Sequence, residues 1–231
     1  MSAGPTAPGS AGAARPRILD PSAPGTIESV VAALHGGSVV VIPTDTVYGV
    51  AAALDHSPAL DRIFEIKGRA TAKPLPVLIS SSDHLRDVSV AADERLLDFA
   101  ARFWPGALTI VLPARPSLPV QVVGRDAAGE PTVGVRIPAH SLAVEIIERC
   151  GGALAVTSAN RSEKPPARTG VEAAVGIGPA VDLVVDGGLA AGGVASSVVA
   201  FDGSRLRVLR EGGIPRRALE TAWEETRRGL R

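Results

Sequence analysis

Two of the three lysines in the chain lie within seven residues of each other, although the other 21 basic residues are all arginine. Lys67 and Lys73 flank Arg69 directly after a predicted helix. An ammonium group is a compact point charge and a guanidinium is a planar fork, so this combination suits the several anionic groups of a polyphosphate. A cationic turn is also favoured by the dipole at a helix C-terminus. On the residues alone, a polyphosphate site and a solvated turn are equally supported.

Two further polar segments follow predicted strands. Residues 43–49 (Pro-Thr-Asp-Thr-Val-Tyr-Gly) come after the strand at 38–42, and Ser158 and Asn160 come after the strand at 153–157. In open α/β sheets, ligands bind at the carboxyl ends of the strands. The same residue types also favour ordinary turns. No G-x-S-x-G sequence surrounds Ser158, which argues against a nucleophilic serine.

The sequence contains no recognised metal or nucleotide motif. The four histidines are isolated and lack metal-ligand spacing, and neither a Walker A sequence nor a G-x-G-x-x-G after a strand is present. The single cysteine, Cys150, excludes a cysteine cluster and an intrachain disulfide. We therefore predict no metal site held by protein side chains, and any nucleotide must be bound by another design.

The candidate residues need a scaffold that brings them together. Strands are predicted over residues 38–42, 76–80, 107–112, 132–137, 153–157, 182–185, 197–201 and 205–209. Helices are predicted over residues 26–34, 57–68, 92–103, 141–149, 169–175 and 215–227. Their alternation favours an α/β fold, and the near-continuous apolar runs are typical of strands covered on both faces. Residues 114–131 form a long Pro/Gly-rich connection.

Composition narrows the class of protein. The 231 residues are 45% hydrophobic and 21% charged, the balance of a globular protein. Basic and acidic residues both number 24, and this zero net charge argues against a general polyanion binder. Residues 1–25 are rich in Ala, Gly, Pro and Ser and are predicted to be a disordered tail before a single domain over 26–231. Without a membrane span or a secretory h-region, we expect a soluble cytoplasmic protein.

A series of motifs runs in order from about residue 27 to 214. The motifs are GGSVVVIPTDTVYG (36–49), IFEIKGR (63–69), KPL (73–75), FWPGALT (103–109), VGVRIP (133–138), TSANRS (157–162) and VLREG (208–212). One such motif would be weak evidence, but the ordered series is specific. It resembles the YrdC-like family, the L-threonylcarbamoyladenylate synthases.

The resemblance implies a twisted, mostly open mixed α/β sheet with flanking helices around a central basic cavity. It implies a nucleotidyltransferase that makes threonylcarbamoyl-AMP and pyrophosphate from L-threonine, bicarbonate and ATP, with Mg²⁺ carried by the ATP phosphates. A separate threonylcarbamoyl transferase complex would then modify the adenosine next to the tRNA anticodon. The alternative is a non-catalytic RNA-binding module that uses the same cavity, with weak RNA binding. The seven aromatic residues lie mostly in predicted core segments, which disfavours that alternative.

The resemblance also implies roles for individual residues. The positions that match catalytic residues are Lys67 and Arg69. The positions that match ATP contacts are Arg69, Lys73, Thr132, Ser158, Asn160 and Arg210. The positions that match threonine contacts are Thr46, Arg136 and Ser196. The chain departs from the family pattern at Ala195, where the family has an acidic residue, and at Glu211, which places a carboxylate next to Arg210 in the sequence.

Overall fold

The computed structural model describes residues 16–68, 73–91, 93–203 and 205–229. Its strands are β1 (Arg17–Leu19), β2 (Val40–Ile42), β3 (Gly49–Ala53), β4 (Val77–Ile79), β5 (Leu108–Pro113), β6 (Gly124–Arg125), β7 (Pro131–Arg136), β8 (Ala153–Ser158), β9 (Leu183–Val185), β10 (Ser197–Asp202) and β11 (Arg205–Arg210). Its α-helices are α1 (Thr26–His35), α2 (Ser57–Lys67), α3 (Leu85–Val88), α4 (Glu94–Ala101), α5 (Ser141–Arg149), α6 (Gly170–Gly176) and α7 (Arg216–Gly229). Three short 3-10 helices are η1 (Ser82–His84), η2 (Val120–Val122) and η3 (Gly178–Ala180).

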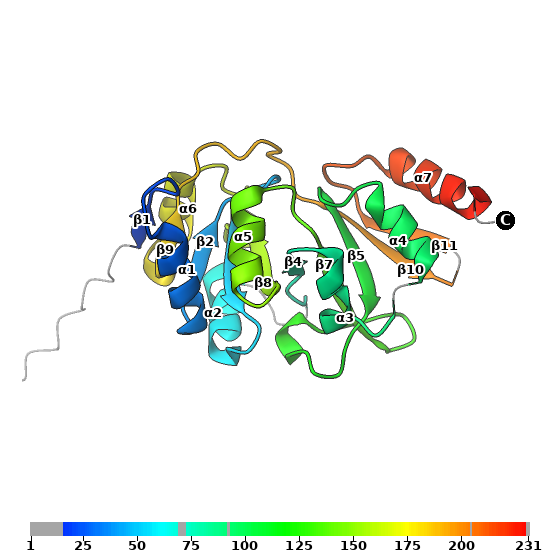
Figure 1. The fold of residues 1–231 in the computed structure, drawn as a ribbon, viewed down its shortest axis with the longest axis horizontal. Helices are drawn as coiled ribbons and strands as arrows, with labels where there is room; N and C mark the ends of the chain where they lie inside the picture. Colours follow the sequence, from blue (N-terminus) through cyan, green and yellow to red (C-terminus); the bar gives the residue numbers. More distant parts are fainter. Residues whose placement is uncertain (1–15, 69–72, 92, 204, 230–231) are drawn as a thin grey trace, which may run out of the picture.

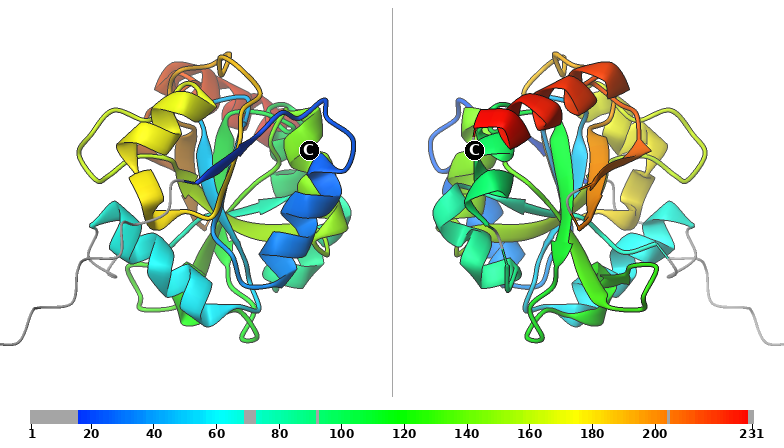
Figure 2. Two further views of the ribbon diagram at one scale, coloured as in Figure 1. Left: turned by 90° about the vertical axis from the view of Figure 1, so that its left-hand side faces the viewer. Right: turned by 90° about the vertical axis from the view of Figure 1, so that its right-hand side faces the viewer.

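All of these strands belong to one sheet, which is mixed and does not close. Its order is β1-β9-β2-β3-β8-β4-β7-β5-β10-β11, with β6 paired to β7 beside this path. Neighbours pair in both directions: β4 runs parallel to β7 and antiparallel to β8. Helices surround the strands when the molecule is viewed end-on (Figure 2). The predicted α/β class with an open mixed sheet is confirmed.

Both faces of the central strands are covered, and alternate residues enter different hydrophobic clusters. In β2, Val40 and Ile42 join a cluster with residues of α1 and α5, such as Leu34 and Ile146. Val41 points the other way, into the larger cluster that contains apolar residues of α2. Figure 1 shows α1 and α5 side by side over this part of the sheet. The continuous apolar runs in the sequence follow from this two-sided burial.

Aromatic packing fixes the other end of the sheet. Phe99 of α4 lies edge-on to Trp223 of α7, with ring centroids 5.5 Å apart. Trp223 also packs against Phe201 of β10, at 4.6 Å between centroids. These contacts anchor the two helices to the strand pair β10–β11 (Figure 1). They hold in place the two strands next to Ser196, which directly precedes β10, and Arg210, which ends β11.

The predicted tail over residues 1–25 is wrong in its last part. Residues 17–19 form β1, which pairs in parallel with β9. Backbone hydrogen bonds join Arg17 N to Asp182 O at 3.2 Å and Asp186 N to Leu19 O at 2.9 Å. A three-residue strand that depends on a distant partner leaves little signal in the local composition. Residues 1–15 lie outside the described ranges.

Strand β3 was not predicted, although it is central to the sheet. Its sequence, Gly-Val-Ala-Ala-Ala, is poor in the β-branched residues that mark strands. Small residues suit this position, because a Cβ at Gly49 would come within 2.5 Å of Val156 Cγ1 on the neighbouring β8. The other predicted elements are found with small shifts at their ends, and the 114–131 connection contains β6 and η2. Across the described ranges, no helix has the length and hydropathy of a membrane span.

The turn after β11 packs closely against the backbone that precedes β10, and this packing can be tested by substitution. Gly212 N donates to Ser197 Oγ at 2.9 Å, and a Cβ at Gly212 would overlap the backbone of Ala195 and Ser196. Backbone atoms cannot move aside cheaply, so Gly212→Ala should lower the free energy of unfolding by about 2 kcal/mol or more. Gly176 at the end of α6 has open space at the same point. Gly176→Ala is therefore the matched control and should leave the thermal midpoint nearly unchanged; equal midpoints for the two variants would contradict the packing described.

Candidate active site

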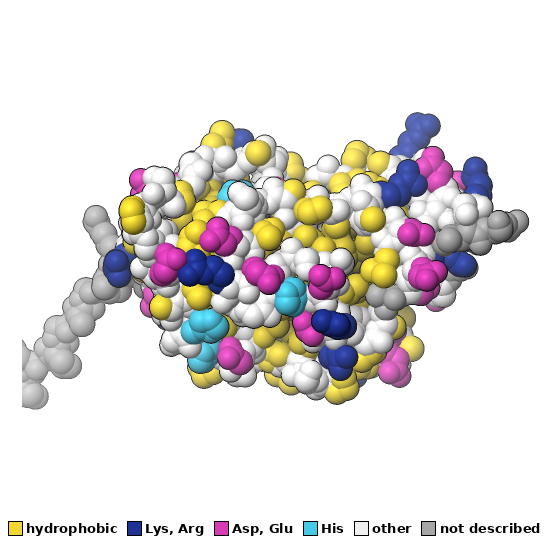
Figure 3. All heavy atoms as spheres, viewed as in Figure 1, with side chains coloured by type: hydrophobic (Ala, Val, Ile, Leu, Met, Phe, Trp, Pro, Cys, Tyr) yellow, Lys and Arg dark blue, Asp and Glu magenta, His cyan; other side chains and the backbone are white. Residues whose placement is uncertain are grey.

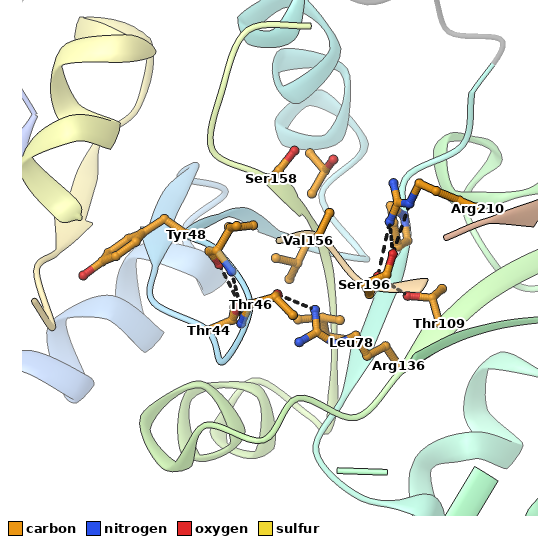
Figure 4. Close-up of a pocket in the computed structure, with 15 residues that line it drawn as sticks. Thr44, Thr46, Tyr48, Leu78, Thr109, Arg136, Val156, Ser158, Ser196 and Arg210 are labelled. Atoms are coloured by element: carbon orange, nitrogen blue, oxygen red, sulfur yellow. Dashed lines mark hydrogen bonds between the residues drawn. The ribbon is translucent and has the colours of Figure 1, made fainter. Parts of the chain in front are cut away.

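A pocket opens where strands from distant parts of the sequence end. Its cavity has a volume of about 80 Å³. Strands β7, β8 and β11 end at it, and the loop after β2 forms one wall. Its polar lining residues are Thr44, Thr46, Tyr48, Thr109, Arg136, Thr157, Ser158, Ser196 and Arg210 (Figure 4).

Arg136, the last residue of β7, is the buried cation of this pocket. Its side chain is 7% exposed, and its Nη2 forms an ion pair with Asp45 Oδ1. Nη1 donates to Thr46 Oγ1 at 2.9 Å, and Nε donates to Gly106 O at 2.8 Å. Burial lowers the pKa of Arg136, and the Asp45 carboxylate opposes that shift. Because an uncompensated buried charge costs several kcal/mol, Asp45 allows the guanidinium to remain charged.

The loop that carries Asp45 is closed by threonine hydroxyls. Thr44 Oγ1 donates to Val47 O at 2.6 Å and accepts from Thr46 N at 3.2 Å. The hydroxyls of Thr44 and Thr46 are themselves 3.0 Å apart. Both side chains are buried. The loop therefore presents Thr46 to Arg136 in a fixed geometry.

Lys67 joins the end of α2 to the end of β8. Its side chain is buried, and Nζ donates to Ser158 O at 2.7 Å, Asn160 O at 2.8 Å and Asn160 Oδ1 at 3.1 Å. The Asn160 amide donates in turn to Arg161 O at 3.0 Å and to Lys164 O. The predicted residues Lys67, Ser158 and Asn160 are thus in direct contact. Lys67 orients the two polar residues that follow β8.

A second guanidinium faces the pocket from β11. Arg210 donates to Ser196 O through Nε at 3.1 Å and through Nη2 at 2.7 Å, and Ser196 Oγ lies 2.8 Å from Thr109 Oγ1 (Figure 4). Partial burial lowers the pKa of Arg210. Within the described ranges neither Arg210 nor the exposed Glu211 takes part in an ion pair. The carboxylate next to Arg210 in the sequence therefore does not neutralise it.

The structure brings together most of the predicted site residues. Thr46, Arg136, Ser158, Ser196 and Arg210 line one pocket, and Asn160 is joined to it through Lys67.

Two predicted ATP contacts lie away from the pocket lining. Lys73 is exposed, and Thr132 is half-buried on β7. Arg69 lies outside the described residues.

Sequence reasoning gave no role to Tyr48, which holds a long loop against the site. Its hydroxyl donates to Gly188 O at 2.7 Å and to Asp186 Oδ1 at 3.3 Å. The same loop donates from Gly192 N to Asp45 O at 3.0 Å and from Gly193 N to Thr46 O at 2.7 Å. In Figure 1 this loop crosses the top of the molecule from β9 to β10. Tyr48 lies within a quoted motif, but no sequence signal indicated its partners.

Comparison with known proteins places this sequence and fold among relatives. The family described as "Telomere recombination" (Sua5/YciO/YrdC) matches residues 32–212. The "Threonylcarbamoyl-AMP synthase" of Bacillus subtilis (strain 168) is 37% identical over 194 residues, which are 84% of this chain and 55% of that protein. A relative from Mycobacterium tuberculosis (strain ATCC 25618 / H37Rv) is 35% identical over 188 residues, 81% of this chain and 84% of that protein.

A solved structure agrees with the same grouping. It is titled "Crystal structure of P. abyssi Sua5 complexed with L-threonine" and has a TM-score of 0.81 at 33% identity. The alignment covers 89% of this chain and 60% of that one. This chain spans little more than half the length of the Bacillus and Pyrococcus relatives that it matches.

Tyr48 offers a direct test of the geometry, because it is the single tyrosine of the chain. Burial, followed by the charge of Asp186, raises its pKa to about 12. The folded value exceeds the unfolded value of about 10, so the stability contributed by Tyr48 is complete below about pH 10 and is lost as the pH rises through the folded pKa.

Tyrosinate absorbance should therefore report a midpoint near 12 in the native protein and one near 10 in denaturant. A native midpoint near 10 would contradict a buried Tyr48 hydroxyl. The Tyr48→Phe variant should lack the absorbance change altogether and serves as the blank.

Proposed function

The chain belongs to the Sua5/YciO/YrdC family, and from that premise we propose that it forms threonylcarbamoyl-AMP and pyrophosphate from L-threonine, bicarbonate and ATP. The observation that carries the proposal is the buried Arg136, held charged by Asp45 beside Thr46. The names of the Bacillus and Pyrococcus relatives support it. In this reaction the chain acts as a nucleotidyltransferase.

Threonine is proposed to bind at the end of the pocket formed by Arg136, Thr46 and Ser196. One hydrogen of each Arg136 Nη atom is used by Asp45 or Thr46, and each Nη atom has a second one. Two parallel N–H groups suit a carboxylate. Fixing the carboxylate there directs the amino group of threonine toward the rest of the pocket.

ATP is proposed to lie along the other side, which holds Ser158 and Asn160. Lys67 fixes these two residues through its ammonium group. The remaining proposed ATP contacts are Arg69, Lys73, Thr132 and Arg210. Lys67 and Arg69 are the proposed catalytic residues, because positive charge at this end would stabilise the negative charge that develops on pyrophosphate.

The proposed reaction relies on positioning. The carbamate of threonine attacks the α-phosphorus of ATP, a P–O–P bond breaks, and pyrophosphate leaves. Such a step needs aligned reactants and charge neutralisation more than a covalent nucleophile. The pocket lining within the described ranges supplies arginine and hydroxyl groups, without histidine or cysteine. That composition supports direct attack by the substrate.

Mg²⁺ is proposed to arrive with ATP. Within the described ranges, no three or more His, Cys, Asp or Glu side chains are grouped so that they could hold a metal ion. Asp45, the acidic residue next to the pocket, is already paired with Arg136. Magnesium is often bound mainly through substrate phosphates. There it would neutralise part of the phosphate charge.

The product is proposed to pass to a separate threonylcarbamoyl transferase complex in the cytoplasm, which modifies the adenosine next to the tRNA anticodon. RNA binding by this chain is less well supported. All seven aromatic side chains fall within the described ranges, where each is buried or half-buried and none offers an exposed stacking surface. Acidic and basic side chains are interspersed on the face shown in Figure 3.

The proposal is tested by pyrophosphate release from ATP. Release should require threonine and bicarbonate together, and mass spectrometry should detect the threonylcarbamoyl adenylate. Arg136→Ala should lower kcat/KM for threonine by about 30-fold or more, since it removes a buried charge-assisted contact. ATP binding by calorimetry should persist in that variant.

The exposed Arg125 provides the control Arg125→Ala, which should retain wild-type kinetics. Because Arg136→Ala leaves Asp45 buried without its partner, Asp45→Asn/Arg136→Ala is assayed beside it to separate misfolding from lost binding. Release that needs neither co-substrate, or a folded Arg136 variant with unchanged threonine kinetics, would refute the proposal.

A further inference from the structure

Thr109 lines the pocket, and its neighbours fix its hydroxyl in place. Thr109 is 4% exposed, and its Cγ2 would lie 3.3 Å from a Cβ built on Gly134 of the neighbouring β7. The bare glycine therefore makes room for the threonine methyl group. The hydroxyl is left toward the pocket, 2.8 Å from Ser196 Oγ (Figure 4). The packing of β5 on β7 thus presents to the pocket a hydroxyl that belongs to neither the proposed threonine contacts nor the proposed ATP contacts.

Thr109, Ser196 and Arg210 offer more hydrogen-bond donors than acceptors. The two hydroxyls share one hydrogen bond, so whichever donates, the hydrogen of the other remains available. Arg210 donates to Ser196 O through Nε and Nη2 and to Ser196 Oγ through Nη2 at 3.3 Å, and within the described ranges its Nη1 makes no hydrogen bond. Thr109 and Ser196 are buried and Arg210 is exposed beside them, and buried hydroxyls next to surplus donors favour a ligand that brings acceptor oxygens.

The distribution of charge in the pocket also favours an anion at this cluster. Arg136 is compensated by Asp45, whereas Arg210 meets no carboxylate within ion-pair distance among the described residues. The two guanidinium groups share one pocket, and Arg210 contributes to the lowered pKa of Arg136. An added anion would therefore be stabilised most strongly next to Arg210. The cluster combines one planar fork with hydroxyl donors, which suits a planar oxyanion.

We propose that Thr109, Ser196 and Arg210 form a subsite for a planar carboxyl oxyanion, and that bicarbonate occupies it. The inference rests on the proposed function and identifies where its second co-substrate binds. Ser196 belongs both to this subsite and to the proposed threonine site, so the two reactants would lie side by side. Arg210 would reach both the oxyanion and the nucleotide.

The chemistry at this subsite balances without a further reactant. The threonine amine attacks the bicarbonate carbon, a C–N bond forms, and one C–O bond breaks. The departing hydroxide takes a proton from the amine and leaves as water. The carbamate has the same charge as bicarbonate, so it can accept hydrogen bonds from the same donors of the subsite. One of its oxygens then attacks the α-phosphorus, and pyrophosphate leaves with the electrons of the broken P–O bond.

The test is a pair of variants at Thr109 assayed for pyrophosphate release. Thr109→Val keeps the shape and removes the hydroxyl, whereas Thr109→Ser keeps the hydroxyl and removes the methyl group. Losing a hydrogen bond to an anion should raise the KM for bicarbonate about tenfold in Thr109→Val. The KM values for threonine and ATP should stay within about twofold, which is below the effect of one lost hydrogen bond. Thr109→Ser should resemble the wild type.

Each other outcome overturns the assignment. A raised KM for threonine with unchanged bicarbonate kinetics would show that the subsite binds the carboxylate of threonine instead of bicarbonate. Unchanged kinetics in a Thr109→Val protein of normal thermal midpoint would exclude the hydroxyl as a ligand contact. If Thr109→Val were unfolded, Thr109→Ala would replace it in the same assay.

A binding measurement separates failure of the subsite from failure of the proposed function. The ¹³C resonance of labelled bicarbonate should broaden with the wild type and less with Thr109→Val, whether or not pyrophosphate is released. Greater broadening with the wild type, but no pyrophosphate release, would refute the proposed synthase function and support the bicarbonate subsite. Turnover with equal broadening in both proteins would refute the subsite and keep the synthase.

Discussion

The arrangement of the pocket depends on the ion pair that neutralises one buried guanidinium. Arg136 at the end of β7 stays charged because Asp45 meets it from the loop after β2. That loop is closed by the hydroxyl of Thr44 and covered by the segment held by Tyr48. The strands β2 and β7 are separated in the sheet by β3, β8 and β4. One ion pair therefore connects elements that the backbone ladder leaves apart, and the pocket forms between them.

The positively charged side chains of the pocket differ in how far they are compensated, and each type of partner fits a different role. Arg136 is compensated, whereas Arg210 meets neutral oxygen atoms of Ser196. Lys67 is bonded to the residues after β8 and sets their orientation. In the proposed reaction the compensated cation is pre-organised for the threonine carboxylate, and the other keeps donors for the anions of the remaining substrates. A site of this kind accelerates a reaction by alignment and charge neutralisation.

The sequence predicted the fold class and most elements, because β-branched runs and helical periodicity are local signals. It missed β3, whose alanines and glycine carry no strand signal, and β1, which exists through its pairing with β9. The motifs indicated which residues share a site, but not what holds them. Asp45 is 91 residues from Arg136, and Tyr48 is 138 residues from Asp186. Such partners are fixed by sheet order, which no local pattern reveals.

The most direct measurement is a crystal structure with L-threonine and a non-hydrolysable ATP analogue bound together. The threonine carboxylate is expected on Arg136 beside Thr46, with its amino group toward Thr109 and Arg210, and the nucleotide on the side of Ser158 and Asn160. Phosphate density on Arg136, or threonine bound away from the Asp45–Arg136 pair, would contradict the division of the pocket into an amino acid end and a nucleotide end.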